Sequence, residues 1–179
     1  MFARVARSFS SQAVRIRLND FHSKHEPVKV TAKEAMERVI KSNQNIFVQG
    51  GAAAPLTLLN GLADFVRENK KSVSGVKLHH VHLEGKLGVY DPDLDGHIRG
   101  QNMFIGASAR KAVQEGRGDF IPVFLHEIPM LYRNKIIPLD VAFVHLSPPD
   151  RHGFCSLGVT FVDFLWQFLE ILLTLRSVL

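Results

Sequence analysis

Apolar positions along the middle of the chain recur at helical spacing in some stretches and form short continuous runs in others. Thr31 and Glu34 form a T-x-x-E capping box, and the apolar positions that follow predict a helix from residue 32 to residue 40. A second apolar stripe predicts a helix that begins near Pro55 and fades by Lys70. Short apolar runs predict buried strands at residues 45–49, 76–83, 102–106 and 139–146.

Between the last two of these strands the sequence adds a short helix and an extended run. Ser108 can cap a helix over residues 109–115, and Gly116 can end it. Residues 120–125 are extended, but Pro122 has no amide hydrogen and therefore favours a sheet edge or a bulge. Strands that alternate with helices predict an α/β domain with an open, mostly parallel sheet and flanking helices.

Both ends of the chain depart from this pattern. Residues 1–18 carry four arginines and no acidic residue, which predicts a mitochondrial targeting segment, with a disordered basic tail as the alternative. Residues 19–30 predict a linker, which leaves residues 31–158 for the α/β domain. Residues 159–179 form a divergent apolar tail. It is marginal as a membrane span, which needs about 20 apolar residues with few charges, and a core helix or a dangling apolar end is at least as well supported.

Composition and charge narrow the classes of function. Hydrophobic residues make up 46% of the chain and charged residues 22%, as in soluble globular proteins. The net charge of +5 suggests nucleic acid, but without the arginines of residues 1–18 the 22 basic residues fall to 18, against 17 acidic ones. The body of the chain therefore carries no electrostatic footprint for nucleic acid. A single cysteine, Cys155, cannot form an internal disulfide, which fits a reducing compartment.

The turn QGGAAAP at residues 49–55 joins a predicted strand to a predicted helix. Gly50 and Gly51 let backbone amides approach a ligand closely, and the helix N-terminus beyond Ala52 favours an anion. The spacing matches neither a dinucleotide fingerprint nor a P-loop. On spacing alone, a tight turn that simply needs glycine is the more frequent explanation.

The turn SPPDRHG at residues 147–153 is a second candidate, because it follows the most convincing predicted strand. Open α/β sheets place ligands at the carboxyl ends of their strands. The prolines, the aspartate and the glycine favour a rigid turn. The residues singled out are Pro148, Pro149, Asp150, His152 and Gly153.

Two further groups are weaker candidates. His80 and His82 share one face of the strand that also carries His79, and could ligate a metal, but no cysteine pair or nearby carboxylate completes a ligand set. Cys155 is better explained as a small buried residue than as a nucleophile. Glu127 follows an extended run, as site residues on loops often do, or is simply solvated.

Three segments together resemble the acetyl-CoA hydrolase/transferase family, which includes acetate and 4-hydroxybutyrate CoA-transferases. They are NIFVQGGAAAP at residues 45–55, GASARKAVQEGRGDFIPVFLHEIPMLYR at 106–133 and DVAFVHLSPPDRHGFCSLG at 140–158. The resemblance covers residues 28–158. After residue 158 the pattern fades, which suggests a truncated form of a longer chain.

The resemblance implies a CoA-transferase-like N-terminal α/β domain in a mitochondrial matrix enzyme. Its expected substrates are coenzyme A thioesters such as acetyl-CoA and short carboxylic acids, with no metal, no nucleic acid and no membrane, and a homo-oligomer is one expected assembly. A glutamate would carry coenzyme A as a thioester in a ping-pong reaction. That glutamate belongs to the second half of the longer chain, so the resemblance implies no catalytic residue in this sequence and an inactive chain. The glycine turn (Gly50, Gly51, Ala52) and the 147–153 turn would shape the cleft between two domains.

Overall fold

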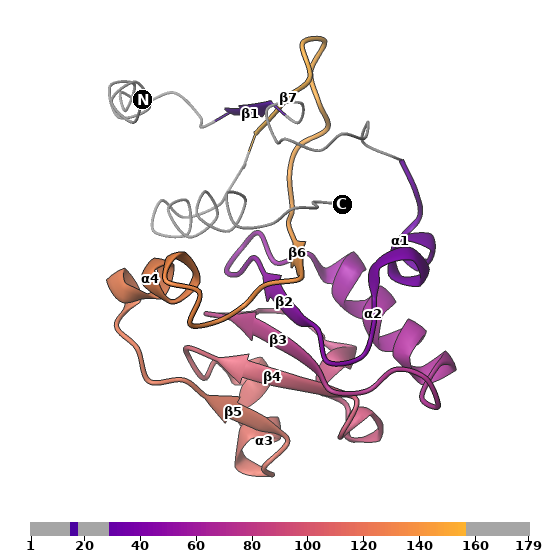
Figure 1. Cartoon of the computed structure of the whole chain (residues 1–179), viewed down its shortest axis with the longest axis vertical. Helices are drawn as coiled ribbons and strands as arrows, with labels where there is room; N and C mark the ends of the chain where they lie inside the picture. The colour runs from indigo at the N-terminus through magenta and orange to yellow at the C-terminus, as the bar shows by residue number, and fades with distance from the viewer. Residues whose placement is uncertain (1–14, 18–28, 157–179) are drawn as a thin grey trace.

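The computed structural model describes residues 15–17 and 29–156, and side chains for residues 29–156. Its centre is a five-stranded sheet in the order β5-β4-β3-β2-β6, in which every neighbouring pair is parallel (Figure 1). The strands are β2 (Asn45–Val48), β3 (Val76–His80), β4 (Ile98–Asn102), β5 (Gly118–Phe120) and β6 (Val141–Phe143). The predicted open α/β fold is confirmed.

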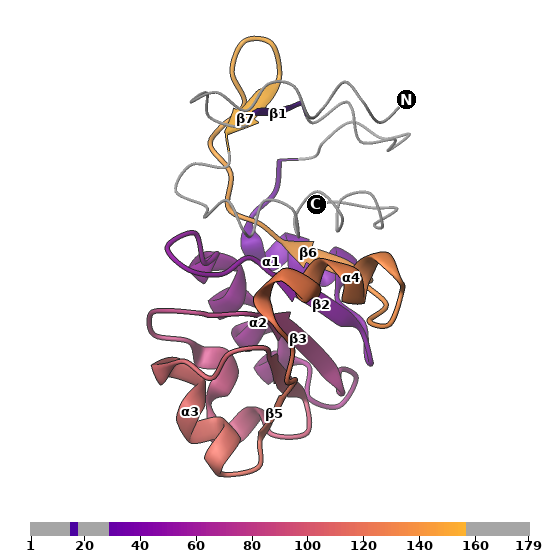
Figure 2. The same ribbon diagram turned by 90° about the vertical axis from the view of Figure 1, so that its left-hand side faces the viewer.

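Helices cover both faces of this sheet, as the two views in Figures 1 and 2 show. The α-helices are α1 (Ala32–Val39), α2 (Leu56–Glu68), α3 (Ala107–Gln114) and α4 (Ile128–Arg133). Short 3-10 helices are η2 (Gly88–Tyr90), η3 (Pro92–Leu94) and η4 (Leu125–Glu127). None of the described helices is long and apolar enough to cross a membrane, and the predicted apolar tail lies outside the described residues.

Alternation along β2 separates the core into two apolar clusters. Ile46 and Val48 belong to the cluster that α1, α2 and α3 cover, whereas Phe47 belongs to the cluster under α4. All three side chains are at most 2% exposed. A strand buried on both faces needs a continuous apolar run, which is why NIFV was recognisable in the sequence.

The capping box at the start of α1 forms as predicted. Glu34 N donates to Thr31 Oγ1 at 3.3 Å, and Thr31 N donates to Glu34 Oε2 at 2.8 Å. The helix then buries Ala35 and Met36 against the sheet. The strand predicted at residues 139–146 shortens to β6, which is buried but lies at an edge of the sheet.

The strand predicted at residues 102–106 is wrong, because the observed strand lies upstream. β4 has Ile98, Gly100 and Asn102 on its buried face and Arg99 and Gln101 on its other face, so Ile98 is its one apolar side chain and it lacks the apolar signature of a strand. Arg99 and Gln101 are instead held by Asp119 of the neighbouring strand β5.

The helix predicted over residues 109–115 begins two residues earlier than expected, at Ala107. Its N-cap residue is Gly106, and the Ser108 hydroxyl donates to Leu83 O at 2.6 Å. Gly116 follows the helix with φ of 76°, as a helix-ending glycine should. β5 is an edge strand that ends at Phe120, so the predicted extended run at residues 120–125 forms a strand only at its first residue, Pro122 lies beyond the strand, and Leu125 already begins η4.

A second, smaller sheet stands apart from the main one. β1 (Arg15–Arg17) pairs antiparallel with β7 (Phe154–Ser156), and Figures 1 and 2 both place this pair beyond the end of β6. β1 falls within the segment predicted to direct the protein to mitochondria, and that targeting stays a prediction.

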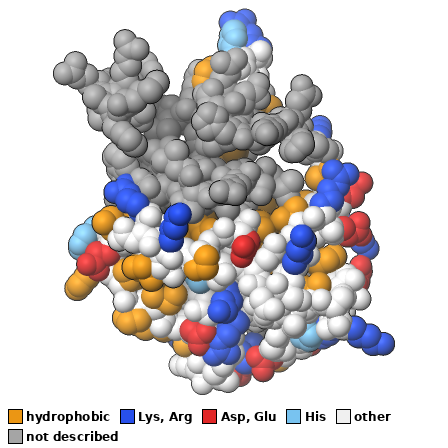
Figure 3. All heavy atoms as spheres, in the orientation of Figure 1, with side chains coloured by type: hydrophobic (Ala, Val, Ile, Leu, Met, Phe, Trp, Pro, Cys, Tyr) orange, Lys and Arg blue, Asp and Glu red, His pale blue; other side chains and the backbone are white. Residues whose placement is uncertain are grey.

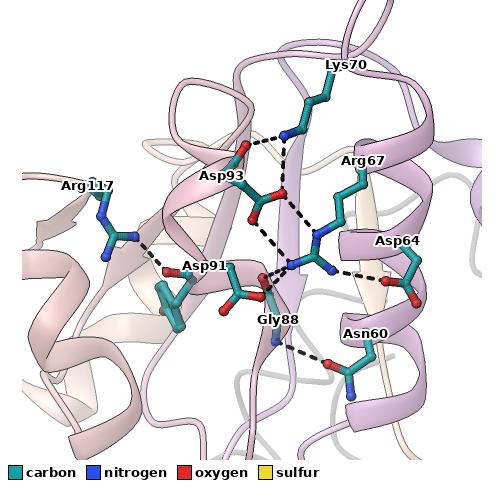
Figure 4. A network of polar contacts seen from close by, with 9 residues as sticks. Asn60, Asp64, Arg67, Lys70, Gly88, Asp91, Asp93 and Arg117 are labelled. Carbon is teal, nitrogen blue, oxygen red and sulfur yellow. Dashed lines mark hydrogen bonds and ion pairs between the residues drawn. The ribbon is translucent and has the colours of Figure 1, made fainter.

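Arg67 of α2 ties the η2–η3 segment to the helix (Figure 4). Its guanidinium donates to Asp93 at 3.1 Å, to Asp64 at 3.1 Å, to Asp91 at 2.5 Å and to Gly88 O at 3.4 Å. Arg67 and Lys70, which also donates to Asp93, hold the pKa of the Asp93 carboxyl below its usual value. One half-buried cation thus fixes a segment that has little regular structure of its own.

We expect Arg67→Ala to lower the free energy of unfolding by about 1 kcal/mol, because it removes a networked cation and leaves Gly88 O without that donor. Urea unfolding followed by far-UV circular dichroism measures the change. Lys33→Ala is the matched control, because it removes only the exposed pair with Glu68 and should leave the urea midpoint unchanged. Equal midpoints for Arg67→Ala and wild type would contradict the assigned role.

Candidate active-site edge of the sheet

The order of the strands reverses between β2 and β6. The chain steps from β2 through β3 and β4 to β5 in one direction, and then returns to place β6 on the other side of β2. In open α/β sheets, ligands bind outside the carboxyl ends of the strands at such a reversal. The glycine turn follows β2 and the 147–153 turn follows β6, so both predicted candidates begin at this point of the fold.

The glycine turn is held tightly against the segment that follows β3. Gly50 is buried, and a Cβ on it would lie 2.5 Å from His82 O. Gly51 has φ of 65°, and its amide donates to His82 O at 2.8 Å. Both glycines are therefore required by the backbone, as the structural explanation of this turn predicted.

Ala52 is the exposed residue of this turn. Its amide donates to no acceptor within residues 29–156. The helix that follows has Pro55 as its N-cap residue, and no side chain caps it. An uncapped helix N-terminus beside an exposed amide favours an anionic oxygen, so the turn retains the capacity to bind one.

Gln49 joins the carboxyl ends of β2 and β6 and was not singled out in the sequence. Its amide donates to Phe143 O at 3.0 Å, and its side-chain Oε1 accepts from His145 N at 2.5 Å. The side chain is 1% exposed. A buried glutamine just before a glycine turn is the signal that could have identified it, because a buried amide side chain needs partners.

The 147–153 turn forms the tip of a hairpin. Asp150 Oδ1 accepts from His152 N at 2.8 Å and from Phe154 N at 3.0 Å, and Gly153 has φ of 80°. The predicted turn forms, and its rigidity stays a prediction. Figures 1 and 2 show that the hairpin projects beyond the sheet, so the structure does not bring its tip to the glycine turn.

Large apolar side chains are exposed on the loops and strand ends around the same edge and on α4. Phe104 after β4 is 56% exposed and Phe124 after β5 is 71% exposed. Figure 3 shows apolar side chains gathered on the side of the molecule where α4 lies. Leu125, Met130 and Ile136 are also exposed there. Apolar exposure of this kind is typical of surfaces that another protein segment covers.

The three histidines make separate contacts rather than sharing a ligand. The strand predicted at residues 76–83 ends at His80, so His82 lies beyond β3, is only half-buried, and does not share a strand face with His80. His79 Nε2 lies 3.0 Å from Asn45 Oδ1, His82 Nε2 lies 2.9 Å from Glu84 Oε1, and His80 Nε2 contacts the Tyr90 hydroxyl. The described residues contain no group of three or more His, Cys, Asp or Glu that could hold a metal. His80 and His82 therefore find no third ligand among these residues.

Hydrogen bonding determines which ring nitrogen of His80 carries the proton. Asn102 Nδ2 donates to Gly100 O at 3.2 Å and to Asp119 O at 2.9 Å, which orients its Oδ1 to accept from Tyr90 at 2.9 Å. The Tyr90 oxygen then accepts from His80 Nε2–H, and His80 Nδ1 stays buried without a partner. Burial lowers the pKa of His80 to about 3 and that of His79 to about 4.

The remaining candidates behave as their simpler explanations predicted. Cys155 is 2% exposed, and burial, followed by the charge of Asp150, raises the pKa of its thiol. Glu127 is exposed at the start of α4, where it is the N-cap residue. Neither is placed as a nucleophile or base in the described part of the chain.

A strand-order reversal followed by a glycine turn and an uncapped helix is the place where open α/β domains commonly bind their ligands. A sequence model described as acetyl-CoA hydrolase/transferase N-terminal domain matches residues 16–171. The chain therefore belongs to the acetyl-CoA hydrolase/transferase family. The matched range includes residues 159–171, so where the predicted tail begins stays a prediction.

Curated relatives agree with this assignment. The chain is 45% identical over 119 residues to succinyl-CoA:acetate/propanoyl-CoA:succinate CoA transferase of Fasciola hepatica, across 66% of this chain and 24% of that protein. It is 33% identical over 131 residues to 4-hydroxybutyrate coenzyme A transferase of Clostridium kluyveri, across 73% of this chain and 29% of that protein. The chain thus spans less than a third of the length of either relative.

Solved structures share the fold. RipA from Yersinia pestis superposes with a TM-score of 0.69 at 24% identity, over 83% of this chain and 35% of RipA. The 4-hydroxybutyrate CoA-transferase from Porphyromonas gingivalis gives a TM-score of 0.53 at 20% identity, over 83% of this chain and 31% of that chain.

We expect the folded protein to lose stability as the pH falls from 6.5 to 4. The unfolded chain binds protons on His79 and His80 in this range, whereas the folded chain does not, so the free energy of unfolding falls by about 1.4 kcal/mol per pH unit for each histidine. His79→Gln should remove about half of this dependence in urea unfolding measured across the range.

His126→Gln is the matched control, since His126 is exposed and its replacement should keep the wild-type pH profile. If His79→Gln also keeps that profile, His79 is not buried as a neutral imidazole.

Proposed function

We propose that this chain is the N-terminal part of a CoA-transferase that moves coenzyme A between an acyl-CoA, such as acetyl-CoA, and a short carboxylic acid, such as acetate or 4-hydroxybutyrate. The observation that carries the proposal is the glycine turn at the strand-order reversal of a domain in this family. The Fasciola and Clostridium relatives, which are named as CoA transferases, support the reaction class.

The proposed chemistry is covalent catalysis by a glutamate carboxylate outside this chain. The carboxylate attacks the acyl-CoA carbonyl and expels the CoA thiolate, which leaves an acyl-glutamyl anhydride. The thiolate then attacks the glutamyl carbonyl, which releases the first acid and leaves a glutamyl-CoA thioester. The acceptor acid reverses these two steps, so that the new acyl-CoA leaves and the glutamate is regenerated. Coenzyme A is a substrate, and no metal takes part.

In this proposal the chain supplies one wall of the substrate cleft. Gly50 and Gly51 would hold the turn in place, so that the exposed Ala52 amide faces an anionic oxygen of the acyl-CoA or of the oxyanion formed during attack. The turn residues Pro148, Pro149, Asp150, His152 and Gly153 would border the same cleft where a second domain meets this one. The exposed apolar loops around Phe104 and Phe124 support a covered edge rather than a solvated one.

A second candidate is a half-domain that binds a partner and does no chemistry by itself. The observation that favours this candidate is how little of the relatives the chain covers, 24% of the Fasciola relative and 29% of the Clostridium relative. Hydrolysis of acetyl-CoA is a third, since water and a carboxylate compete for the same thioester. The proposed location is the mitochondrial matrix, on the basis of the basic residues 1–18.

We expect the isolated 179-residue protein to show no CoA transfer from acetyl-CoA to succinate or 4-hydroxybutyrate, because the glutamate lies outside the chain. Product formation is measured by chromatography, with the Fasciola relative as the positive control. Turnover that survives repeated purification would contradict this expectation and place the catalytic carboxylate among the residues present.

A chimera tests the glycine turn directly. Residues 28–158 of this chain replace the matching segment of the Fasciola relative, which supplies the rest of the enzyme. We expect the chimera to transfer coenzyme A, and Gly50→Ala to lower its kcat/KM for acyl-CoA at least tenfold, because the added Cβ would lie 2.5 Å from His82 O and displace the turn.

Gly96→Ala is the matched control in the same chimera. Gly96 has φ of 76° and open space around it, so alanine there costs about 1 kcal/mol of backbone strain far from the proposed cleft. Equal kcat/KM values for the two variants would show that the glycine turn has no role in catalysis.

A further inference from the structure

The hydrogen-bond ladder between β2 and β6 ends where the two chains separate. The last register pair is Val48 with Phe143, and Gln49 N still donates to Phe143 O at 3.0 Å. If this parallel ladder continued, His145 N would donate to Gln49 O and Gly51 N would donate to His145 O. Both donors take a different acceptor. The strands therefore part at Gln49, where the strand order reverses.

The side chain of Gln49 takes the place of its own backbone carbonyl. His145 N donates to Gln49 Oε1 at 2.5 Å, and the Gln49 side chain is 1% exposed. A glutamine side-chain oxygen stands farther from Cα than the backbone oxygen does, so it holds the β6 chain across a wider gap. The His145 amide thus keeps an acceptor after the ladder has ended.

The second donor turns to the other neighbour of β2. Gly51 N donates to His82 O at 2.8 Å, and Gly51 has φ of 65°. Gly50 lies so close to the same carbonyl that a Cβ on it would be 2.5 Å away. The glycine turn therefore leans toward the segment that follows β3 and away from β6. This lean separates the two chains at the reversal, where open α/β sheets bind ligands.

We infer that Gln49 is a positioning residue, whose side chain spans the separation of β2 and β6 and so keeps the glycine turn against His82. Without an acceptor on this side chain, the His145 amide takes the backbone carbonyl of residue 49, and the ladder gains the next bond as well. That change draws Gly51 toward β6 and moves the exposed Ala52 amide. The effect of this movement on catalysis rests on the proposed function, whereas the movement itself does not.

A purely structural role for Gln49 leads to a different expectation. A buried amide that only satisfies its neighbours stabilises the fold, so its loss lowers stability and leaves the acceptor of Gly51 unchanged. The positioning role requires that this acceptor changes. The identity of the carbonyl that each amide faces is therefore the quantity to measure.

The experiment uses NMR couplings across hydrogen bonds, which identify the carbonyl carbon that each amide nitrogen faces. In the 179-residue chain we expect His145 N to couple to Gln49 Cδ, and Gly51 N to couple to the carbonyl carbon of His82. Gln49→Met keeps the size of the side chain and removes the acceptor. In this variant the His145 coupling should move to the backbone carbonyl of residue 49, and the Gly51 coupling should move to His145.

Gln44→Met is the matched control at the opposite end of β2. Gln44 Oε1 also accepts from a backbone amide, that of Lys41 at 2.8 Å, and its loss should leave both couplings in place. Gln49→Glu keeps an oxygen at the same position and should retain the wild-type couplings. Gln49→Asn shortens the side chain by one methylene and should move the couplings as Gln49→Met does, even if Gln49→Met fails to fold.

Activity is measured in the chimera with the Fasciola relative. We expect Gln49→Met to lower kcat about tenfold and to keep KM within about threefold of wild type, because the Ala52 amide is proposed to face charge that develops during attack. Gln49→Glu should keep the wild-type kcat, and so should Gln44→Met. A loss of stability alone does not produce this split between kcat and KM.

Two results would overturn the inference. The first is a wild-type His145 amide that shows no coupling to Gln49 Cδ. The second is a Gly51 amide that stays coupled to His82 in both Gln49→Met and Gln49→Asn. Couplings that move as expected support the positioning of the turn. If they move while the Gln49→Met chimera keeps the wild-type kcat, or while the unmodified chimera is inactive, the proposed function alone is refuted.

Discussion

Burial of β2 on both faces is the constraint on which the rest of the structure depends. Ile46 and Val48 pack under α1 and α2, while Phe47 packs against Tyr132 of α4, with the two rings 5.8 Å apart. Because β2 also pairs with both β3 and β6, its placement decides where the strand order reverses. The glycine turn, Gln49 and His145 are positioned by that one strand.

Buried polar groups next to this strand fix how the neighbouring elements are placed against one another. The chain of hydrogen bonds from His80 through Tyr90 and Asn102 to Asp119 O links β3, η2, β4 and β5. Each member would be costly to bury alone. At the surface, Arg67 also links separate elements, because it donates hydrogen bonds to the η2–η3 segment that carries Tyr90.

Among the described residues, the domain has a buried core and is open at two places. One is the carboxyl edge, where Phe104 and Phe124 remain exposed. The other is the β6 edge, where an apolar groove lies beside Val141, Ala142 and Phe143. The first lies on the β3 side of β2 and the second on its opposite side.

The sequence by itself determined the fold class, the capping box at Thr31, the strand at Asn45–Val48 and the glycine turn, because each depends on residues that are neighbours along the chain. It missed β4, whose buried face carries glycine and asparagine beside the single apolar Ile98, since Gly100 and Asn102 become buried only when Tyr90 and Asp119 reach them. Gln49 was missed for the same reason, because His145 is 96 residues away. Only the tertiary structure decided that the 147–153 turn projects from the sheet and that β6 ends it. The local sequence pattern does not contain the information on which strand a later segment will pair with, because that pairing joins residues far apart along the chain.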